Sequence, residues 1–474
     1  MTQSINADIC VIGAGSGGLS VAAGAAQLGR KVVLIERHKM GGDCLNYGCV
    51  PSKALIAAAR HAQTIRDSVP FGVSAGEPKI DFPRVMSHVR EVIAAIEPND
   101  SVERFEKLGV RVIKAAARFT SPTRVEAGDA RIEAKRFVIA TGSAPLIPPI
   151  PGLGDTPYFT NETIFDNTAR PEHLIVIGGG PIGMELAQAH RRLGARVTVL
   201  EAKQIMPKDD PEAVGVVREA LIAEGVVIRE NAAVTAVATT ASGVAATITV
   251  SGKAETISGS HLLLAVGRKV NVDGLNLEAA GVKYSSKGVE VDDTLRTSNR
   301  NIFAIGDAAG GLQFTHVAGY HAGLVIRRAL FKVPAKVDAA AIPWCTYTDP
   351  ELAQIGLTET AAKARGIKIA VTRWPVHDND RAQTERLTRG FIKVVTANGG
   401  RIVGATIVAP NAGDLILPWV LAIGEKLKMS TMAGIVAPYP TVGEISKRVA
   451  GAYYTPTLFS ARTRLLVRLL ASFG

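Results

Sequence analysis

Two cysteines separated by four residues carry the clearest chemistry in this sequence. Cys44 and Cys49 lie in residues 41–53, which read Gly-Gly-Asp-Cys-Leu-Asn-Tyr-Gly-Cys-Val-Pro-Ser-Lys, and the chain has only four cysteines in 474 residues. We expect the two thiols on neighbouring turns at the start of a helix, close enough to form a disulfide. A helix N-terminus lowers the pKa of a thiol, and the thiolate is the reactive form. The pair therefore predicts a redox-active disulfide.

A structural bridge or the remnant of a metal site are the alternatives. Zinc sites usually have closer cysteines and a second ligand pair, which this sequence does not show, so we predict no resident metal site. Residues 1–7 do not have the pattern of a signal peptide. Few cysteines and no such signal predict a cytoplasmic protein, where a retained cysteine pair is more often catalytic than structural.

The elements before the cysteines form a pattern typical of dinucleotide binding. A predicted strand over residues 7–12 leads into a turn with Gly13, Gly15 and Gly18, then a helix over 19–28 and a strand over 31–35 that ends at Glu36. The glycines allow a pyrophosphate to approach the backbone and the helix N-terminus, and the acid meets a ribose hydroxyl.

The same pattern recurs later in the chain. A strand over residues 174–177 leads into Gly178, Gly180 and Gly183, then a helix from about residue 184 and a strand over 196–200 that ends at Glu201. In both copies the acid comes 23 positions after the first glycine. One such turn is weak evidence, but two copies with strand, helix and acid in register are strong evidence. They predict two dinucleotide sites, the alternative being one site and a degenerate copy.

The position of each copy indicates its ligand. The first leads directly into the cysteine pair, so its ligand is the redox relay, a flavin. The second would hold the hydride donor, and Glu201 favours the free 2′-hydroxyl of NAD(H) over the 2′-phosphate of NADP(H). Lys203 and Lys208 lie nearby and would weaken that preference.

Further segments close these units. A strand over 136–139 precedes Thr141 and Gly142, and a proline-rich connection over 145–151 reads as a linker. The second unit ends at Gly267 and Arg268. A buried strand before Gly306 and Asp307 would aim an acid at a polyol chain, although Gly-Asp alone is more often a turn. After residue 342 the pattern changes to an α+β domain, in which 391–396 and 402–408 alternate like antiparallel strands.

Five ordered motifs now carry a resemblance, at residues 13–18, 44–53, 178–185, 302–307 and 439–444. With them the chain resembles, over residues 5–450, the flavin-dependent pyridine nucleotide–disulfide oxidoreductases, the group of lipoamide dehydrogenase, glutathione reductase and mercuric reductase. The resemblance implies an α/β fold with two Rossmann-like domains and a C-terminal α+β dimerisation domain, FAD on the first unit, NAD(P)H on the second, and a homodimer. The predicted domains are FAD-binding 1–150, NAD(P)H-binding 151–270, central 271–341, interface 342–451 and a tail 452–474.

The resemblance also implies roles for the residues around the cysteines. Cys49 would face the flavin and Cys44 the substrate. Lys53 would lie beside the flavin with Glu185 as its acidic partner, the alternative for Glu185 being an ordinary exposed helix acid. Motifs and resemblance together place FAD at Gly13, Gly15, Gly18, Glu36, Gly42, Thr141, Gly142, Gly306 and Asp307, and NAD at Gly178, Gly180, Gly183, Glu201 and Gly267.

One departure from the family bears on the substrate. In lipoamide dehydrogenase and glutathione reductase the segment matching 437–444 supplies an acid–base histidine from the other subunit, but here Tyr439 stands in its place, ahead of Glu444. Tyrosine has a pKa of about 10 and is a poor base near neutrality. The loss of such a proton shuttle is typically worth roughly 10²–10⁴-fold in rate, which argues against lipoamide as the physiological substrate.

Tyrosine at this place resembles mercuric reductase, yet the C-terminal cysteine pair and the amino-terminal Cys-x-x-Cys domain of that enzyme are missing. Soft metals need thiolates for their transfer. We therefore expect a disulfide or other two-electron acceptor as substrate. The alternatives are a metal-ion reductase that uses the same dithiol, and a redox-sensing or docking flavoprotein with slow diaphorase or quinone reduction.

Charge and hydropathy limit the partners. A net charge of +11 favours anionic cofactors, acidic partners or an anionic membrane surface. No basic stripe interleaved with aromatic residues indicates nucleic-acid binding, and no apolar run has membrane-spanning length. Ser460 is predicted to cap a helix over 461–473, with Leu465, Leu466, Leu469, Leu470 and Phe473 on one face and Arg462, Arg464 and Arg468 off it. This helix would pack on its own domain or dimer, or residues 460–474 would make a weak membrane-surface contact.

The remaining cysteines and two histidines are expected to be structural. Cys10 lies inside the first predicted strand and Cys345 near the start of the last domain. Free cysteine is among the most buried residue types. His316 and His321 follow the Gly-Asp motif and are expected to make packing or backbone contacts near the flavin.

Overall fold

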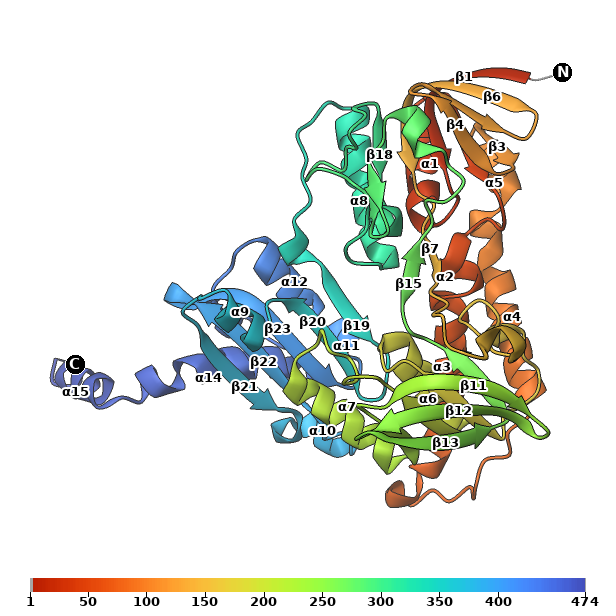
Figure 1. Ribbon diagram of the computed structural model, residues 1–474. Helices are drawn as coiled ribbons and strands as arrows, with labels where there is room; N and C mark the ends of the chain where they lie inside the picture. Colours follow the sequence, from red (N-terminus) through yellow and green to blue (C-terminus); the bar gives the residue numbers. More distant parts are fainter. Residues whose placement is uncertain (1–2, 474) are drawn as a thin grey trace. The chain divides into compact units, whose positions relative to one another are not determined.

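The computed structural model describes residues 3–473, which divide into two compact units (Figure 1). Unit 1 comprises the chain up to Lys203 together with Arg229–Val337, and unit 2 comprises Gln204–Ile228 together with the chain from Asp338 onward. Each unit contains both helices and strands, which confirms the predicted α/β class. None of the helices described within residues 3–473 is long and apolar enough to cross a membrane.

The first sheet of unit 1 positions the first dinucleotide turn. Its strands lie in the order β3-β2-β1-β6-β5-β4, with β18 paired to β6. Strands β3, β2, β1, β6 and β18 run parallel, whereas β4, β5 and β6 form an antiparallel meander. The strands are β1 (Gln3–Ile12), β2 (Val32–Glu36), β3 (Val110–Lys114), β4 (Ala117–Ser121), β5 (Arg124–Ala127), β6 (Ala130–Ile139) and β18 (Ile302–Ala304).

Both faces of this sheet are covered. On β1, Ile9 and Val11 pack on the side of α1 (Ser16–Gln27) and α8 (Thr315–Ala329), whereas Cys10 and Ile12 pack on the opposite side with Phe119. Burial on both faces explains why these strands read as continuous apolar runs without alternation.

A second parallel sheet carries the second dinucleotide turn. Strand β8 (His173–Ile177) lies between β9 (Arg196–Leu200) and β14 (His261–Leu264), and α6 (Pro181–Arg192) follows β8. An antiparallel sheet of β11 (Ala233–Thr240), β12 (Gly243–Val250) and β13 (Lys253–Gly259) precedes β14. Strand β7 (Ser143–Pro145) follows β6 of the first sheet, and strand β15 (Arg268–Val270) follows β14 of the second sheet. These two short strands pair antiparallel.

Helices complete unit 1. The cysteine segment forms the short α2 (Gly42–Asn46) and the start of α3 (Cys49–Arg66), and α3 packs against both α4 (Phe82–Ile96) and α6. The remaining elements are α5 (Val102–Lys107) and the two-residue strands β16 (Tyr284–Ser285) and β17 (Gly288–Val289).

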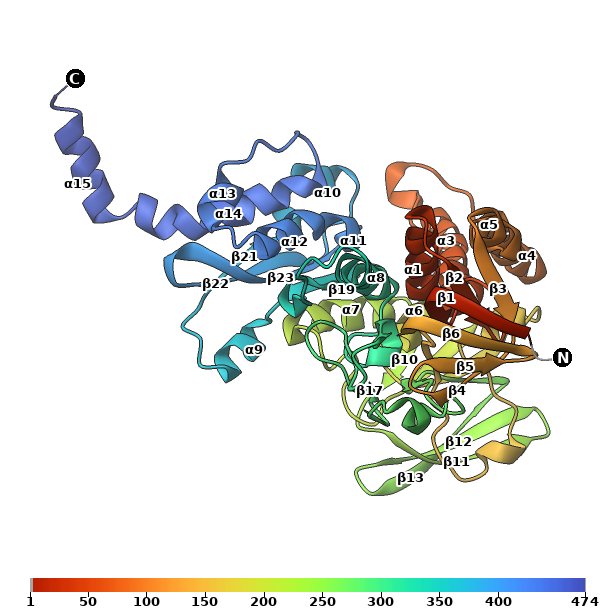
Figure 2. The same cartoon turned by 90° about the horizontal axis from the view of Figure 1, so that it is seen from above.

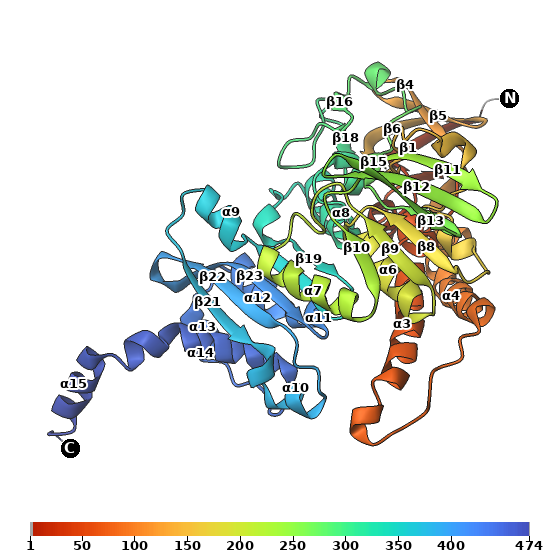
Figure 3. The same ribbon diagram turned by 60° about the horizontal axis from the view of Figure 1, so that its bottom comes forward.

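Unit 2 is built on a five-stranded antiparallel sheet in the order β19-β20-β23-β22-β21 (Figure 3). The buried Trp419 lies in its core cluster and donates a hydrogen bond from Nε1 to Ser446 Oγ at 3.1 Å. The strands of this sheet are β19 (Pro343–Thr346), β20 (Glu351–Gly356), β21 (Ala370–Pro375), β22 (Phe391–Ala397) and β23 (Arg401–Ala409). Strand β10 (Val226–Arg229) spans the division of the chain between the two units and is not part of this sheet. The helices are α7 (Pro211–Ala223), α9 (Glu359–Ala364), α10 (Asp380–Thr384), α11 (Ala412–Leu415), α12 (Leu417–Gly424), α13 (Met429–Ala433), α14 (Ile445–Leu458) and α15 (Ala461–Leu470).

A buried ion pair joins α7 to this sheet. Lys393 on β22 contacts Asp210 at 3.0 Å and Glu212 at 2.6 Å, and Asp210 also caps the N-terminus of α7. Residues 204–228, expected within the NAD(P)H-binding domain, thus group with the C-terminal sheet.

Several element boundaries differ from expectation by a few residues. Helix α6 begins at Pro181 because proline suits the first helical position. Ser460 caps α15 as expected, through its hydroxyl and the amide of Thr463, but the helix ends at Leu470.

Candidate active site

The two glycine turns share one backbone geometry. Gly13 has φ +104°, and a Cβ added there would lie 2.3 Å from the carbonyl oxygen of Ala140. Gly178 has φ +111°, and its Cβ would lie 2.3 Å from the carbonyl oxygen of Ala265. A residue with a side chain would clash at either position, so each turn can pass beneath a neighbouring strand end only with glycine.

The remaining glycines of the two turns keep the backbone at the N-termini of α1 and α6 free of side chains. A Cβ on Gly18 or Gly183 would come within 2.0 Å of the carbonyl oxygen of the first glycine of its own turn. Gly15 and Gly180 are the N-caps of α1 and α6, and neither helix start has a side-chain cap. Gly42 packs against Gly15, where its Cβ would lie 2.7 Å from the Gly15 Cα. Uncapped amides beside side-chain-free backbone fit a pyrophosphate at both turns.

In each dinucleotide unit, the acid at the end of the second strand accepts hydrogen bonds from backbone amides, one of which belongs to the glycine turn. Glu36 accepts hydrogen bonds from the amide of Ala14 and from the amide two residues after itself, both at 2.7 Å. Glu201 accepts from the amide of Gly179 at 2.7 Å and from the amide two residues after itself at 2.9 Å. Each carboxylate oxygen keeps further acceptor capacity for a ribose hydroxyl.

The cysteines lie as an unequal pair of free thiols. Cys49 is the first residue of α3, and the Cys44 thiol donates a hydrogen bond to it. Cys49 is an exposed residue whose sulfur is partly shielded from water. The bond from Cys44, a bond from Thr315 and the charge of Lys53 outweigh this partial desolvation and lower the pKa of Cys49 to about 6. The same thiol–thiol bond, together with burial, raises the pKa of Cys44. Cys49 is therefore the thiolate of the pair and Cys44 the thiol.

Two side chains flank the pair. The Thr315 hydroxyl, at the start of α8, lies 3.3 Å from the Cys49 sulfur. Lys53, one turn along α3 from Cys49, forms an ion pair with Glu185 on α6 at 2.7 Å between Nζ and Oε2. Glu185 is buried, with its side chain 7% exposed, so it is not an ordinary surface acid. A cation is thus held near the thiolate by a carboxylate on another helix.

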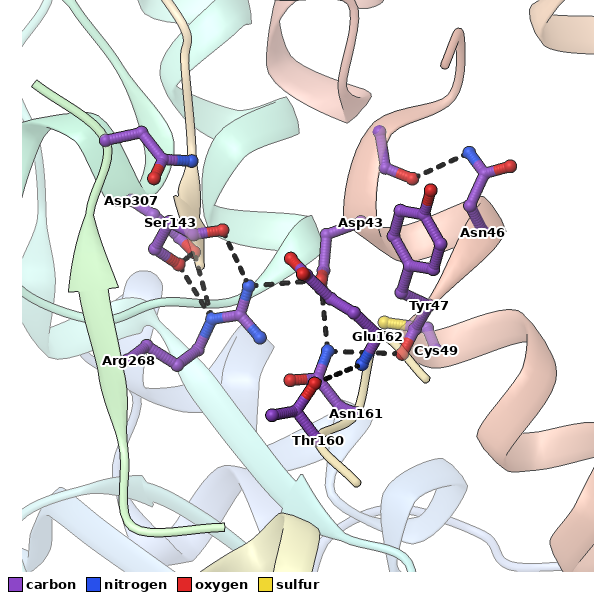
Figure 4. Close-up of polar contacts among 12 residues, drawn as sticks. Asp43, Asn46, Tyr47, Cys49, Ser143, Thr160, Asn161, Glu162, Arg268 and Asp307 are labelled. Atoms are coloured by element: carbon purple, nitrogen blue, oxygen red, sulfur yellow. Dashed lines mark hydrogen bonds and ion pairs between the residues drawn. The ribbon is translucent and has the colours of Figure 1, made fainter. Parts of the chain in front are cut away.

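Arg268 links the cysteine segment to the Gly-Asp turn (Figure 4). Its Nη2 lies 3.1 Å from Asp43 Oδ1, next to Cys44, and its Nε lies 3.9 Å from Asp307 Oδ2. Between them, Ser143 donates to Asp307 at 2.5 Å and accepts from Arg268 Nε at 2.7 Å. Burial raises the pKa of Asp307 against the opposing effects of Ser143 and Arg268.

The remaining sites expected for FAD are held by backbone contacts. Thr141 donates from its hydroxyl to the carbonyl of Asn271 at 2.6 Å, and the carbonyl of Gly142 accepts from the Asn271 amide at 3.0 Å. Gly306 donates its amide to His321 Nδ1 at 3.2 Å, which is the backbone contact expected for this histidine. Gly267, expected at the NAD site, has φ +126° and lies between β14 and β15.

Tyr439 and Glu444 belong to unit 2 and have partners there. The Tyr439 hydroxyl donates to Asp380 Oδ2 at 2.9 Å, which raises the pKa of the phenol further above its ordinary value. Glu444 pairs with Arg448 at 2.7 Å. In this arrangement Tyr439 is a protonated donor and not a base near neutral pH.

The other expected structural residues are placed as follows. Cys10 is fully buried in β1, and His316 stacks on Phe314 with ring centroids 5.3 Å apart. Cys345 is half-buried in β19 against the unit 2 core. Across residues 3–473, no group of three or more histidine, cysteine, aspartate or glutamate side chains could hold a metal ion.

The sequence reasoning missed the contacts that join these motifs. Asp43, Ser143 and Thr315 are not among the residues predicted for the site, and Arg268 is predicted only as the end of the second unit. Their sequence signal was adjacency: Asp43 precedes Cys44, Ser143 follows Gly142, and Arg268 follows Gly267.

Two dinucleotide turns and a polarised dithiol on one scaffold define a flavin- and nicotinamide-linked oxidoreductase. The chain matches the family "Pyridine nucleotide-disulphide oxidoreductase" over residues 7–322 and the dimerisation domain of that family over residues 342–450. The chain belongs to this family, which confirms the predicted resemblance and supports the use of FAD and a pyridine nucleotide and the formation of a homodimer.

Individual relatives agree with this assignment. The chain is 35% identical to a mercuric reductase of Streptomyces lividans and 37% identical to a dihydrolipoyl dehydrogenase of Geobacillus stearothermophilus, over 94% of this chain and 96% of each relative. Among solved structures, it is similar to the Cu(II) complex of the HOCl-induced flavoprotein disulfide reductase RclA from Escherichia coli, with a TM-score of 0.84, 26% identity, and coverage of 94% of this chain and 99% of that one.

Proposed function

We propose that this protein is an FAD-dependent oxidoreductase that takes electrons from NADH and passes them through Cys44 and Cys49 to a small-molecule disulfide or another two-electron acceptor. The observation that carries the proposal is the unequal dithiol: Cys49 has a pKa of about 6 while the hydrogen-bonded Cys44 stays protonated. FAD, held by the first turn, Glu36 and Asp307, would supply two-electron transfer between nicotinamide and the cysteine pair.

Disulfide reduction then needs one proton to move between the cysteines. The Cys44 proton passes along the existing hydrogen bond to Cys49, and the Cys44 thiolate attacks the acceptor disulfide. The first acceptor thiolate leaves and takes the proton from Cys49. Cys49 attacks the mixed disulfide at Cys44, the Cys44–Cys49 bond forms, and the second acceptor thiolate leaves and takes a proton from water. The two electrons of the dithiol thus end on the two acceptor thiols.

This route uses Cys49 as the base because Tyr439 is unsuited to it. A phenol whose pKa is raised by Asp380 cannot take a thiol proton near neutrality. We infer that the physiological acceptor does not depend on a histidine-type proton shuttle, and that dihydrolipoamide oxidation is not the main activity.

The nicotinamide cofactor is proposed to be NADH. The proposal is supported by Glu201, which binds the amide of Gly179 in the turn, because an acid at this position of such a turn accepts the ribose 2′-hydroxyl and would repel a 2′-phosphate. Cytoplasmic location is likewise a proposal, supported by the small number of cysteines and the reactive pair among them.

Reduction of a metal ion is the second candidate, and specific observations favour it. Tyr439 stands where the histidine of dithiol reductases stands, one close relative is a mercuric reductase, and the similar RclA structure is a Cu(II) complex. Two neighbouring thiolates would bind a soft ion as substrate. A third possibility is a sensing or docking flavoprotein that reduces quinones slowly.

A substrate panel separates these candidates. NADH oxidation is measured with lipoamide, oxidised glutathione, Hg²⁺, Cu²⁺ and a soluble quinone, for the wild-type enzyme and for Cys44→Ser. Disulfide turnover that Cys44→Ser abolishes supports the proposal, and metal turnover that it abolishes supports the second candidate. Quinone turnover that survives Cys44→Ser, with no thiol-dependent activity, refutes both.

A further inference from the structure

The end of unit 2 presents an apolar helix face that the rest of the unit does not cover. Helix α15 has no buried residue, and it projects beyond α14 away from the β19–β23 sheet (Figure 2). The leucines of this face, Leu465, Leu466, Leu469 and Leu470, are between 54% and 60% exposed, and Phe473, three residues past the end of the helix, is 86% exposed. The expectation that the helix packs on its own domain is therefore not met within unit 2.

The helix is amphipathic in three dimensions. At 3.6 residues per turn, the leucines from Leu465 to Leu470 occupy an arc of about 140°. Arg464 and Arg468 lie on the opposite side. Arg462 is predicted to lie off the apolar face, but in the first turn of the helix it lies on the same side as the leucines. The reason is its spacing, three residues before Leu465 and seven before Leu469. A long arginine side chain at the end of such a face can reach outward to a charged surface.

The charge of the segment is of one sign. No aspartate or glutamate follows Glu444, whereas Lys447, Arg448 and the three arginines of α15 carry positive charge. Two copies of α15 would therefore bring like charges together with no acid to offset them. The family match to the dimerisation domain also ends at residue 450, before this helix begins.

We propose that α15 is a peripheral membrane-binding helix that lies in the surface of an anionic bilayer. Leu465, Leu466, Leu469, Leu470 and Phe473 enter the acyl boundary, and Arg464 and Arg468 contact lipid phosphates. An apolar face opposed by arginines is the pattern of interfacial helices. The inference is independent of which acceptor the dithiol reduces.

Vesicle sedimentation of the full-length FAD-loaded enzyme tests this proposal. We expect binding to vesicles of phosphatidylcholine with about one-third phosphatidylglycerol, and little binding to phosphatidylcholine alone. Arg464→Gln with Arg468→Gln should weaken partitioning by about 25-fold, at roughly fivefold for each arginine. Leu470→Gln should weaken it by about tenfold or more, because the apolar side chain no longer enters the bilayer.

Ala471→Gln is the matched control, since Ala471 is exposed and next to Leu470 but lies off the apolar arc. It should bind vesicles like the wild type, and all variants should keep wild-type NADH oxidation with the same soluble acceptor. Binding that persists after deletion of residues 460–474, or that does not require anionic lipid, overturns the proposal. So does a deletion that converts the dimer to monomers, because α15 would then be a subunit contact.

Discussion

The pKa of Cys49 should move in opposite directions when the two charges near it are removed. Lys53 lowers this pKa and Asp43 raises it, and the wild-type value is about 6. Lys53→Met should therefore raise the pKa, and Asp43→Asn should lower it. No general loss of structure at the site would produce shifts of opposite sign.

The size of each shift follows from the arrangement of the charges. An opposite charge within a few ångströms typically moves a pKa by about 1–3 units. Lys53 is already paired with Glu185 at 2.7 Å, and Asp43 with Arg268 at 3.1 Å, so each acts on Cys49 with part of its charge offset. We expect shifts of about one unit or slightly less. A rise of one unit would reduce the thiolate fraction at pH 7 from about 90% to about 50%.

The assay measures the far-ultraviolet absorbance of the thiolate in the reduced protein as a function of pH. The same titration of Cys49→Ser is subtracted as the background. Lys53→Arg is the charge-conserving control and should keep the wild-type pKa. Lys53→Met with Glu185→Gln also removes the buried carboxylate that Lys53 contacts, and Cys49 should titrate at the raised pKa in this variant if the protein is folded. Shifts of the same sign in Lys53→Met and Asp43→Asn, or none in either, would refute this account of the dithiol.

Three further perturbations have defined outcomes. Lys393→Met leaves Asp210 buried without its cation and should reduce the free energy of unfolding by about 3–5 kcal/mol in chemical denaturation, whereas the exposed Lys363→Met should change it by less than about 0.5 kcal/mol. Glu201→Ala should raise KM for NADH by about tenfold in steady-state assays, since one hydrogen bond to the 2′-hydroxyl is lost, and it should lower KM for NADPH, since the carboxylate no longer repels the 2′-phosphate; a rise of KM for NADPH would contradict the cofactor assignment. Tyr439→Phe should leave disulfide turnover within about twofold, and Tyr439→His should increase it by roughly 10²-fold through a restored proton shuttle; a large loss in Tyr439→Phe would show that the phenol takes part in the proton transfer.

Local sterics made the two dinucleotide turns predictable from the sequence. Gly13 and Gly178 cannot carry a side chain beside a neighbouring carbonyl, and the acid 23 residues later accepts the amides of its own turn. Such constraints act over short stretches of chain and leave a regular spacing. The cysteine pair is also a local feature: Cys44 and Cys49 are close in the sequence, and helix α3 begins at Cys49 as the sequence predicts.

Contacts between distant segments were not predictable in this way. Arg268 meets Asp43 across more than two hundred residues, and Lys393 meets Asp210 across 183. Neither pairing follows a helical or strand period, so only the assembled sheets bring the partners together. The free face of α15 illustrates the same limit: periodicity predicts an amphipathic helix, but not whether another element covers it.

Anaerobic titration with NADH tests the central claim most directly. If Cys49 is the thiolate beside the flavin, reduction by one equivalent should produce a long-wavelength thiolate–flavin charge-transfer band. In Cys44→Ser, which cannot form the disulfide, the band should be present before NADH is added and should fade when NADH reduces the flavin, and Cys49→Ser should show no band at any stage. No band in the wild-type enzyme, or a band that survives in Cys49→Ser, would contradict the proposed electron path.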